Sequence, residues 1–201
     1  LNRFATTGGM AGIEAIEFSD GVVTRILQDQ VALFSTIGTA AGEALTGTIY
    51  ADSISGLAGN DTISSSDGND ILTGGTGNDS LVGGNGSDGY VWTKGEGNDT
   101  LNDAGTAMSD EDRLTLTNVA STDVQLTRAN GSANLIIRII STNEVITVVG
   151  QFGATLSGAG IETITFADGV RWSLADIQTA TKVVGTTAAE TLTGSTRADN
   201  M

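Results

Sequence analysis

A nine-residue repeat in the middle of this 201-residue chain constrains its fold more than any other feature. Six blocks fill residues 38–91 without a gap, and a seventh, KGEGNDTLN, begins at Lys94 after the insertion of Trp92 and Thr93. The sixth position of every block is acidic: Glu43, Asp52, Asp61, Asp70, Asp79, Asp88 and Asp99. The eighth is apolar or aromatic: Leu45, Ile54, Ile63, Leu72, Leu81, Tyr90 and Leu101. A single Gly-Asn-Asp unit would be read as a solvated β-turn, but this register predicts a solenoid.

The length of the repeat predicts how the chain coils. A turn of about six residues and a strand of about three make half a coil, so two blocks close one coil and successive coils stack by parallel pairing about 4.8 Å apart. Residues 18 apart then lie over one another, which places Asp61 over Asp79, and Asp52 over Asp70 over Asp88. The chain has 28 glycines and no proline, and glycine suits turns with positive φ.

Stacked carboxylates about 5 Å apart repel by about 3 kcal/mol at an effective dielectric near 20. Calcium binds oxygen at about 2.3–2.6 Å, so one ion fits between two such carboxylates, and backbone carbonyls of the glycine-rich turns would add further oxygen ligands. This flexible all-oxygen shell suits Ca²⁺ better than Mg²⁺. The sequence therefore predicts several bound calcium ions whose binding free energy contributes to folding.

Composition excludes other classes of partner and site. The net charge of -15 argues against nucleic acid and anionic membranes. The chain has no cysteine and no histidine, which excludes disulfides, thiolate or imidazole metal sites and a histidine general base. The longest apolar run, residues 135–140, is interrupted by Arg138, and the chain opens without a signal-peptide pattern. We expect a soluble monomer with no membrane insertion by this segment.

A second repeat is much longer. The segment IEAIEFSDGV from Ile13 recurs as IETITFADGV from Ile161, at an offset of 148, and EALTG from Glu43 recurs as ETLTG from Glu190, at an offset of 147. We expect tandem units of a longer protein, with the tail of one unit at residues 1–37, a calcium-binding roll at 38–102, a β-rich capping region at 103–184 and the start of the next unit at 185–201. Neighbouring units of the same chain would then be partners.

The capping region shows strand patterns at residues 113–117, 124–127, 135–140 and 145–149, which are rich in β-branched residues. Ser173-Leu174-Ala175-Asp176 has the spacing of a capping box and predicts one short helix. The fold class is therefore all-β, a parallel β-roll followed by a β-rich cap with one short helix.

The blocks GGTGNDSLV and GGNGSDGYV resemble the signature G-G-x-G-x-D-x-U-x of the RTX, or haemolysin-type calcium-binding, family. The stretch Tyr90-Val91-Trp92 is similar to the way in which RTX blocks end in that family. The strand patterns up to Val149 and the segment IETITFADGVRW resemble the region that follows the roll in RTX toxins and adhesins. The resemblance implies a right-handed roll, type I secretion, folding on calcium outside the cell, and a secreted, extracellular or bacterial cell-surface location.

The resemblance also implies a ligand set, in which each sixth-position aspartate is joined by turn carbonyls at the first and third positions of one coil and the second and fourth of the next. On one edge these are Gly56, Ala58 and Asp61 facing Gly75, Gly77 and Asp79, then Gly74, Thr76 and Asp79 facing Gly95, Gly97 and Asp99. On the other edge they are Gly47, Ile49 and Asp52 facing Ser66, Gly68 and Asp70, then Ser65, Asp67 and Asp70 facing Gly84, Gly86 and Asp88.

Some blocks depart from the signature. Glu43 replaces aspartate, Ala41 and Tyr50 stand at glycine positions, and Ser65 and Ser66 replace a glycine pair. We expect the first coil to be a weak or empty site. The two inserted residues leave open whether the Asp99 coil holds an ion.

The first functional reading is a calcium-binding structural module of a large adhesin-like protein. Alternatives are a C-terminal secretion and folding module of a hydrolase or toxin, and a direct binder of sugar or ice. Residue types alone leave room for a glycosidase-like carboxylate pair, but the acids follow the metal register, so we expect no enzyme. Trp92 and Trp172 could stack on sugars or close the core.

Overall fold

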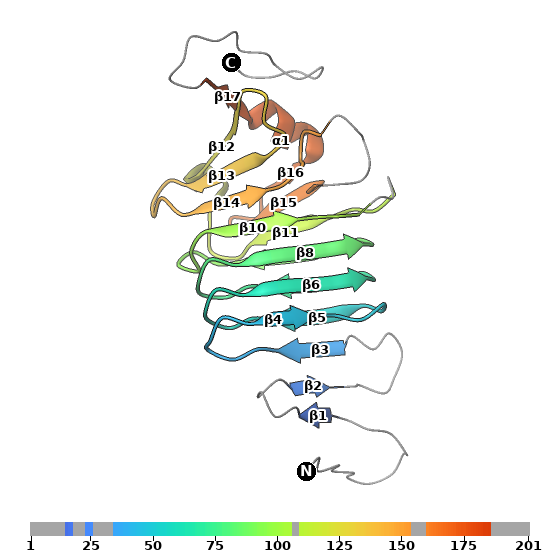
Figure 1. Cartoon of the computed structure of the whole chain (residues 1–201). Coiled ribbons are helices and arrows are strands. Elements are labelled where there is room, and N and C mark those ends of the chain that lie inside the picture. Colours follow the sequence, from blue (N-terminus) through green and yellow to red (C-terminus); the bar gives the residue numbers. More distant parts are fainter. Residues whose placement is uncertain (1–14, 18–22, 26–33, 106–108, 154–159, 186–201) are drawn as a thin grey trace.

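Two long sheets build the molecule, as the computed structural model shows for residues 15–17, 23–25, 34–105, 109–153 and 160–185 (Figure 1). The first sheet has nine strands in the order β1 (Ala15–Glu17), β2 (Val23–Arg25), β3 (Phe34–Ile37), β5 (Asp52–Ser55), β7 (Ile71–Thr73), β9 (Gly89–Trp92), β11 (Arg113–Leu116), β15 (Thr163–Phe166) and β16 (Arg171–Ser173). The second has eight, in the order β17 (Lys182–Val184), β12 (Val124–Ala129), β13 (Leu135–Ile139), β14 (Val145–Val148), β10 (Asp99–Asn102), β8 (Ser80–Asn85), β6 (Thr62–Asp67) and β4 (Ala44–Thr46).

Successive coils stack in parallel at the predicted offset. Ile63 of β6 lies opposite Leu81 of β8, and Leu72 of β7 lies opposite Tyr90 of β9, each pair being 18 residues apart. Odd and even blocks feed opposite sheets, so two blocks make one coil. The prediction of an all-β parallel β-roll is confirmed.

The core lies between the sheets and is filled by the eighth position of each block. These side chains, Leu45, Ile54, Ile63, Leu72, Leu81, Tyr90 and Leu101, are at most 3% exposed. Alternation along each strand sends their neighbours outward, as in β6, where Ile63 is buried and Thr62 is exposed. One aliphatic row per sheet makes a thin core, so burial alone stabilises each coil little.

The β-rich region continues both sheets. Strand β14 pairs in parallel with β10, and β11 pairs in parallel with β9, so the sheets run without interruption past residue 102. Strands β12, β13 and β14 are antiparallel neighbours, and all four strand patterns expected after residue 112 are present. The domain boundaries at residues 102 and 184 remain predictions.

The expected short helix is α1 (Leu174–Ala180), preceded along the chain by a 3-10 turn, η1 (Ser121–Asp123). Ser173 is its N-cap, and the capping box is complete: the Asp176 amide donates to Ser173 Oγ (3.3 Å) and the Ser173 amide to Asp176 Oδ2 (2.9 Å). Among the helices of the described segments, none combines the length and apolar character that crossing a bilayer requires.

The long repeat is visible in the backbone. Strands β1 and β2 form an antiparallel hairpin in which Ala15 lies opposite Arg25. Strands β15 and β16 form the same hairpin 148 residues later, with Thr163 opposite Ser173. Most of the first copy, and the expected start of a further unit at residues 186–201, lie outside the described residues.

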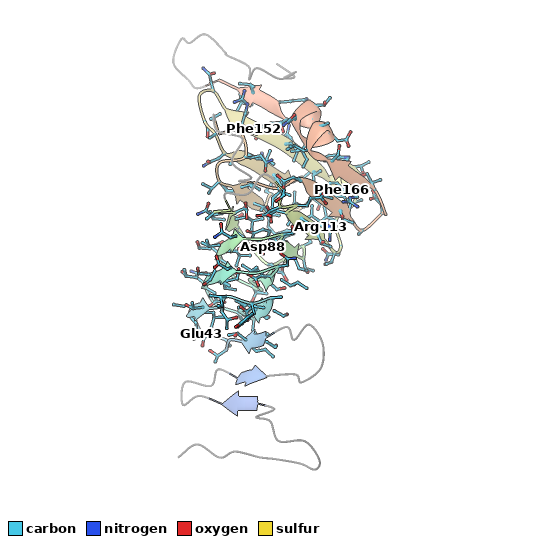
Figure 2. All side chains as sticks on the ribbon, turned by 90° about the vertical axis from the view of Figure 1, so that its right-hand side faces the viewer. Glu43, Asp88, Arg113, Phe152 and Phe166 are labelled. Atoms are coloured by element: carbon cyan, nitrogen blue, oxygen red, sulfur yellow. The ribbon has the colours of Figure 1, made fainter. Side chains whose placement is uncertain are left out.

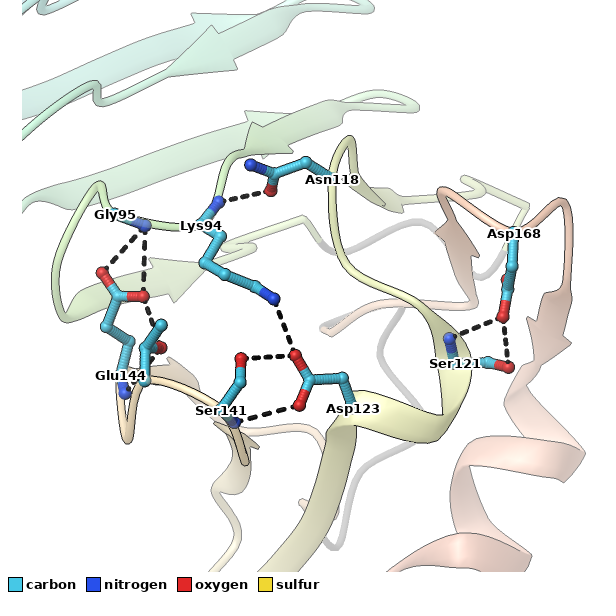
Figure 3. A network of polar contacts seen from close by, with 9 residues as sticks. Lys94, Gly95, Asn118, Ser121, Asp123, Ser141, Glu144 and Asp168 are labelled. Carbon is cyan, nitrogen blue, oxygen red and sulfur yellow. Dashed lines mark hydrogen bonds and ion pairs between the residues drawn. The ribbon is translucent and has the colours of Figure 1, made fainter.

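A polar network fastens the last turn of the roll to the cap (Figure 3). The carboxylate of Glu144 accepts hydrogen bonds from the amides of Gly95 (3.0 Å) and Gly97 (3.0 Å). Lys94 Nζ lies 2.8 Å from Asp123 Oδ2, whose carboxylate also accepts from Ser141. The turn after β9, which begins with the inserted Thr93, is therefore held by side chains of the cap.

Candidate metal centre

The sixth-position aspartates form two buried rows, one along each edge of the roll. Each backbone amide donates to the carboxylate one coil further on: Asp61 to Asp79 Oδ1 (2.7 Å), Asp52 to Asp70 Oδ1 (2.7 Å) and Asp70 to Asp88 Oδ1 (2.9 Å). All six aspartates are at most 3% exposed. Figure 2 shows Asp88 in the body of the roll, between Glu43 near one end and Phe152 in the cap.

One oxygen of these carboxylates is left without a partner. Oδ2 of Asp61, Asp70, Asp79 and Asp88 is buried and accepts no hydrogen bond. Buried oxygens that carry charge are costly unless a donor or a cation compensates them. Burial accordingly raises the pKa of Asp70 and Asp88 to about 6 and that of Asp99 to about 7, and raises the pKa of Asp61 and Asp79 as well.

First-position backbone surrounds the unpartnered oxygens. A Cβ added to Gly74 would lie 2.2 Å from Asp79 Oδ2, and one added to Gly56 would lie 2.2 Å from Asp61 Oδ2 and 2.5 Å from the Gly74 carbonyl oxygen. Carboxylate and carbonyl oxygens thus meet in a space that a side chain would fill. This all-oxygen donor set fits Ca²⁺.

Glycines at the second position, Gly95 excepted, and at the fourth position each lie against the residue at the same position of the preceding coil. Ser66, Gly75, Gly84 and Gly95 at the second position and Gly68, Gly77, Gly86 and Gly97 at the fourth all have positive φ. A Cβ on Gly77 would lie 1.7 Å from the Gly59 carbonyl oxygen. At Gly77 only glycine meets both the conformational and the spatial demand.

Third-position carbonyls already accept one hydrogen bond. The Gly59 amide donates to Thr76 O (2.8 Å), and the Gly68 amide donates to Asn85 O (2.9 Å). A carbonyl oxygen has two lone pairs, so a third-position carbonyl that accepts one hydrogen bond can still coordinate a calcium ion. The roles of Ile49, Ala58, Asp67 and Thr76 remain predictions, as do those of the other turn carbonyls.

The two ends of the rows differ from the middle. Both carboxylate oxygens of Glu43 accept hydrogen bonds from Thr39, from its amide (2.7 Å) and its hydroxyl (2.5 Å), so Glu43 has no unpartnered oxygen. That arrangement favours the expected weak or empty first coil, which stays a prediction. Asp99 continues its row, because the Asp79 amide donates to its Oδ1 at 2.7 Å. Gly95 does not stack as Gly75 does: nothing lies within 4 Å of a Cβ placed there.

Three acids near the junction with the cap were not predicted as site residues: Asp103, Asp112 and Glu162. The Asp88 amide donates to Asp112 Oδ1 (2.7 Å), and the Asp112 amide donates to Glu162 Oε2 (2.8 Å), so one row continues into the cap. Asp103, directly after β10, is 1% exposed. Asp112 lies two residues before the buried Leu114, and Glu162 lies two residues before the buried Ile164, as the acid and the apolar residue do in each block of the repeat. The nine-residue spacing itself is absent here.

An ordered ladder of asparagines flanks the acidic rows. The Asn78 amide donates to Asn60 Oδ1 (2.8 Å) and the Asn98 amide to Asn78 Oδ1 (2.9 Å). The Val145 amide donates to Asn98 Oδ1 (2.7 Å), which carries the ladder to the first residue of β14. Fifth-position asparagines therefore link successive coils beside the row of Asp61, Asp79 and Asp99.

Comparison with known proteins supports this reading. Residues 37–72 and 64–90 match the RTX calcium-binding nonapeptide repeat, and residues 134–176 match the haemolysin-type calcium binding protein related domain. A search among curated proteins gave no match. This chain is also similar to the AlgE6R3 subunit of the Azotobacter vinelandii mannuronan C5-epimerase, known from a solution structure, with 20% sequence identity, coverage of 82% of this chain and 93% of that one, and a TM-score of 0.45. The repeat region of this chain therefore belongs to the RTX calcium-binding nonapeptide repeats, which bind Ca²⁺.

Proposed function

We propose that this chain is a calcium-binding structural module of a large secreted bacterial RTX protein, and that it folds on extracellular calcium after type I secretion. The observation that carries the proposal is the pair of rows of buried aspartates, in which Asp52, Asp61, Asp70, Asp79 and Asp88 each have one unpartnered oxygen. In the absence of a cation these charges repel along the whole roll, and the thin core offers little to offset the repulsion. Calcium therefore acts as a switch between an unfolded and a folded chain.

A tandem arrangement is part of the proposal. The hairpins β1–β2 and β15–β16 share one register at an offset of 148 residues, which supports repetition of the whole unit. An extended array of such modules suits an adhesin that spans distance. A C-terminal secretion and folding module of a hydrolase or toxin is the alternative, and it requires the same calcium chemistry.

We further propose that the module has no catalytic or sugar-binding site of its own. Trp92 is 3% exposed and lies in the core, and the half-buried Trp172 packs edge-on against Phe166 with ring centroids 4.7 Å apart. Incubation with polysaccharides and peptides tests this point, and hydrolysis, epimerisation or retention on a polysaccharide would contradict it.

Circular dichroism during titration with CaCl₂, and separately with MgCl₂, tests the main proposal. We expect a transition from coil to β-structure with calcium alone, with a midpoint of about 10⁻⁴–10⁻³ M, the range of extracellular calcium modules. A chain that is equally folded in chelator and in calcium, or that folds as well with magnesium, would contradict the proposal.

A further inference from the structure

Three buried aspartates converge at the junction of the roll and the cap. Asp88 precedes β9, Asp103 follows β10 and Asp112 precedes β11, so they come from both sheets. One carboxylate oxygen from each lies within 4.8 Å of those of the other two. Asp103 and Asp112 lie between the matched segments 64–90 and 134–176, so neither family description covers them.

Four carboxylate oxygens of this cluster have no partner. Both oxygens of Asp103, and Oδ2 of Asp88 and Asp112, are buried and accept no hydrogen bond. The three residues are at most 1% exposed. These oxygens are buried from water and accept no hydrogen bond. Charged carboxylates in this position therefore require a cation in direct contact.

Asp103 makes the cluster different from the sites between nonapeptide coils. It follows the ninth residue of the last block, Asn102, and so stands where a further block would begin with glycine. Asp103 keeps the backbone carbonyl that a first-position glycine would offer and adds a side-chain carboxylate. The cluster therefore holds one more negative charge than a pair of sixth-position aspartates.

The surrounding hydrogen bonds fix the cluster before any ion arrives. Asp112 accepts from the Asp88 amide through Oδ1 and donates its own amide to Glu162. This leaves Oδ2 of Asp112 directed to the cluster, and it connects the last full coil of the roll to β15 of the cap. A bound ion would tie both sheets together at this level.

We propose that Asp88, Asp103 and Asp112 form a separate calcium site that holds its ion more tightly than the sites between nonapeptide coils and joins the cap to the roll. The inference rests on the proposed function, since it assigns a further site for the same ion. Calcium is the cation of choice because all donors are oxygens, and because Mg²⁺ would have to give up waters in a buried site. More carboxylate ligands give higher calcium affinity, so we expect a difference of roughly tenfold or more in Kd.

Flow dialysis with radioactive calcium tests the site by counting ions bound per chain against free calcium. Asp103→Asn is expected to remove one ion, the one that binds at the lowest free calcium. Glu111→Gln is the matched control, because it removes the same charge from an exposed side chain next to Asp112. It should leave the count and the first binding step unchanged. Loss of the ion in Glu111→Gln, or its retention in Asp103→Asn, overturns the proposal.

A crystal structure of the unmodified chain grown with calcium gives an answer that does not depend on the folding of a variant. An ion within about 2.3–2.6 Å of an oxygen from each of the three aspartates supports the site. Ions between the nonapeptide coils with none at the cluster overturn this inference alone. A chain that binds no calcium at any position overturns the proposed function itself.

Discussion

The backbone amide of Asp79 donates to Oδ1 of Asp99 at 2.7 Å, although these residues are 20 apart rather than 18. The two additional residues are taken up in the turn before β10, where the Thr93 amide donates to Glu96 Oε2 (2.6 Å) and the Glu96 amide to Thr93 O (3.1 Å). Thr100 still lies opposite Ser80 in the sheet. The row of carboxylates therefore continues across the insertion.

Asp79→Asn is expected to have opposite effects with and without calcium. In calcium it removes a charged ligand from the middle of a row and should lower the free energy of unfolding by roughly 3 kcal/mol. In chelator at pH 8 it removes repulsion while the amide oxygen still accepts from Asp61, so the folded fraction should rise. Denaturant unfolding followed by circular dichroism measures both.

Asp67→Asn provides the control for this substitution. Its exposed side chain bonds to Asn85 at 2.8 Å and takes no part in the carboxylate rows. Asp67→Asn should change the free energy of unfolding little, both in calcium and in chelator. If Asp79→Asn lowers the free energy of unfolding as much in chelator as in calcium, Asp79 acts through packing and not through the ion.

Gly77→Ala should destabilise the roll severely. Its φ is 148°, and a Cβ would collide with the Gly59 carbonyl oxygen at 1.7 Å, so a whole coil must shift. We expect a loss of about 3 kcal/mol or more. At Gly89 the nearest atom to an added Cβ is 3.6 Å away, so Gly89→Ala should cost little. Equal thermal midpoints for the two variants would contradict this account.

Two adjacent serines should respond oppositely to glycine. Ser66 has a φ of 83°, so Ser66→Gly relieves strain and should raise the free energy of unfolding by about 0.5–1 kcal/mol. The buried Ser65 hydroxyl donates to Gly83 O at 2.6 Å, and Ser65→Gly should lower stability by about 1 kcal/mol. Chemical denaturation in saturating calcium compares them, and the prediction fails if both changes have the same sign.

Without calcium the roll should be more stable at pH 5.5 than at pH 8. Burial raises the pKa of Asp70 and Asp88 to about 6 and that of Asp99 to about 7, whereas the ordinary pKa of an aspartate in an unfolded chain is 3.8. Their stabilising effect is complete below the unfolded pKa and is lost as the pH rises through the folded values. A pKa that is one unit higher corresponds to about 1.4 kcal/mol, so several such groups together change stability by several kcal/mol.

Saturating calcium should reverse this pH dependence, because the ion binds the deprotonated carboxylates. Far-UV circular dichroism of the same preparation in chelator and in calcium, at both pH values, measures the effect. A folded fraction in chelator that increases from pH 5.5 to pH 8 would contradict it.

Glu144→Ala should loosen the cap from the roll. Its carboxylate accepts from two amides, those of Gly95 and Gly97, and charge-assisted bonds of this kind are stronger than neutral ones. We expect a loss of about 2 kcal/mol and separate unfolding of roll and cap in calorimetry. Lys94→Met removes a partly exposed ion pair and should cost less than about 1 kcal/mol. A single sharp transition in Glu144→Ala, with unchanged midpoint, would contradict the anchoring role.

The roll was predictable because each of its features repeats. The acid at the sixth position determines which residues stack, and the apolar side chain at the eighth determines which enter the core. Asp61 stacks on Asp79 and Ile63 lies in the core, as expected. The capping box at Ser173 was predictable because it is local. The cap was harder: the parallel pairing of β10 with β14 joins residues about 47 apart through no common spacing.

The cluster at Asp103 could not be predicted from periodicity. Asp103 and Asp112 are brought together by strands in different sheets, and neither occupies a sixth position of the gap-free blocks. What the sequence did contain was an acid two residues before an apolar side chain at Asp112 and Glu162. That signal is too short to stand out without the spacing of the blocks.

The amide-to-carboxylate bonds between sixth positions run in one sense along the roll, from the backbone of one coil to the side chain of the coil that follows it. The sixth-position amide of a coil therefore finds its acceptor only when the C-terminal neighbour is in place, and Asp112 and Glu162 supply the last acceptors of one row. We therefore expect assembly to start at the cap and travel toward the N terminus, opposite to the direction of translation. Pulse-labelled hydrogen exchange after addition of calcium would show protection first in the cap strands, and earliest protection in the N-terminal coils would refute this polarity.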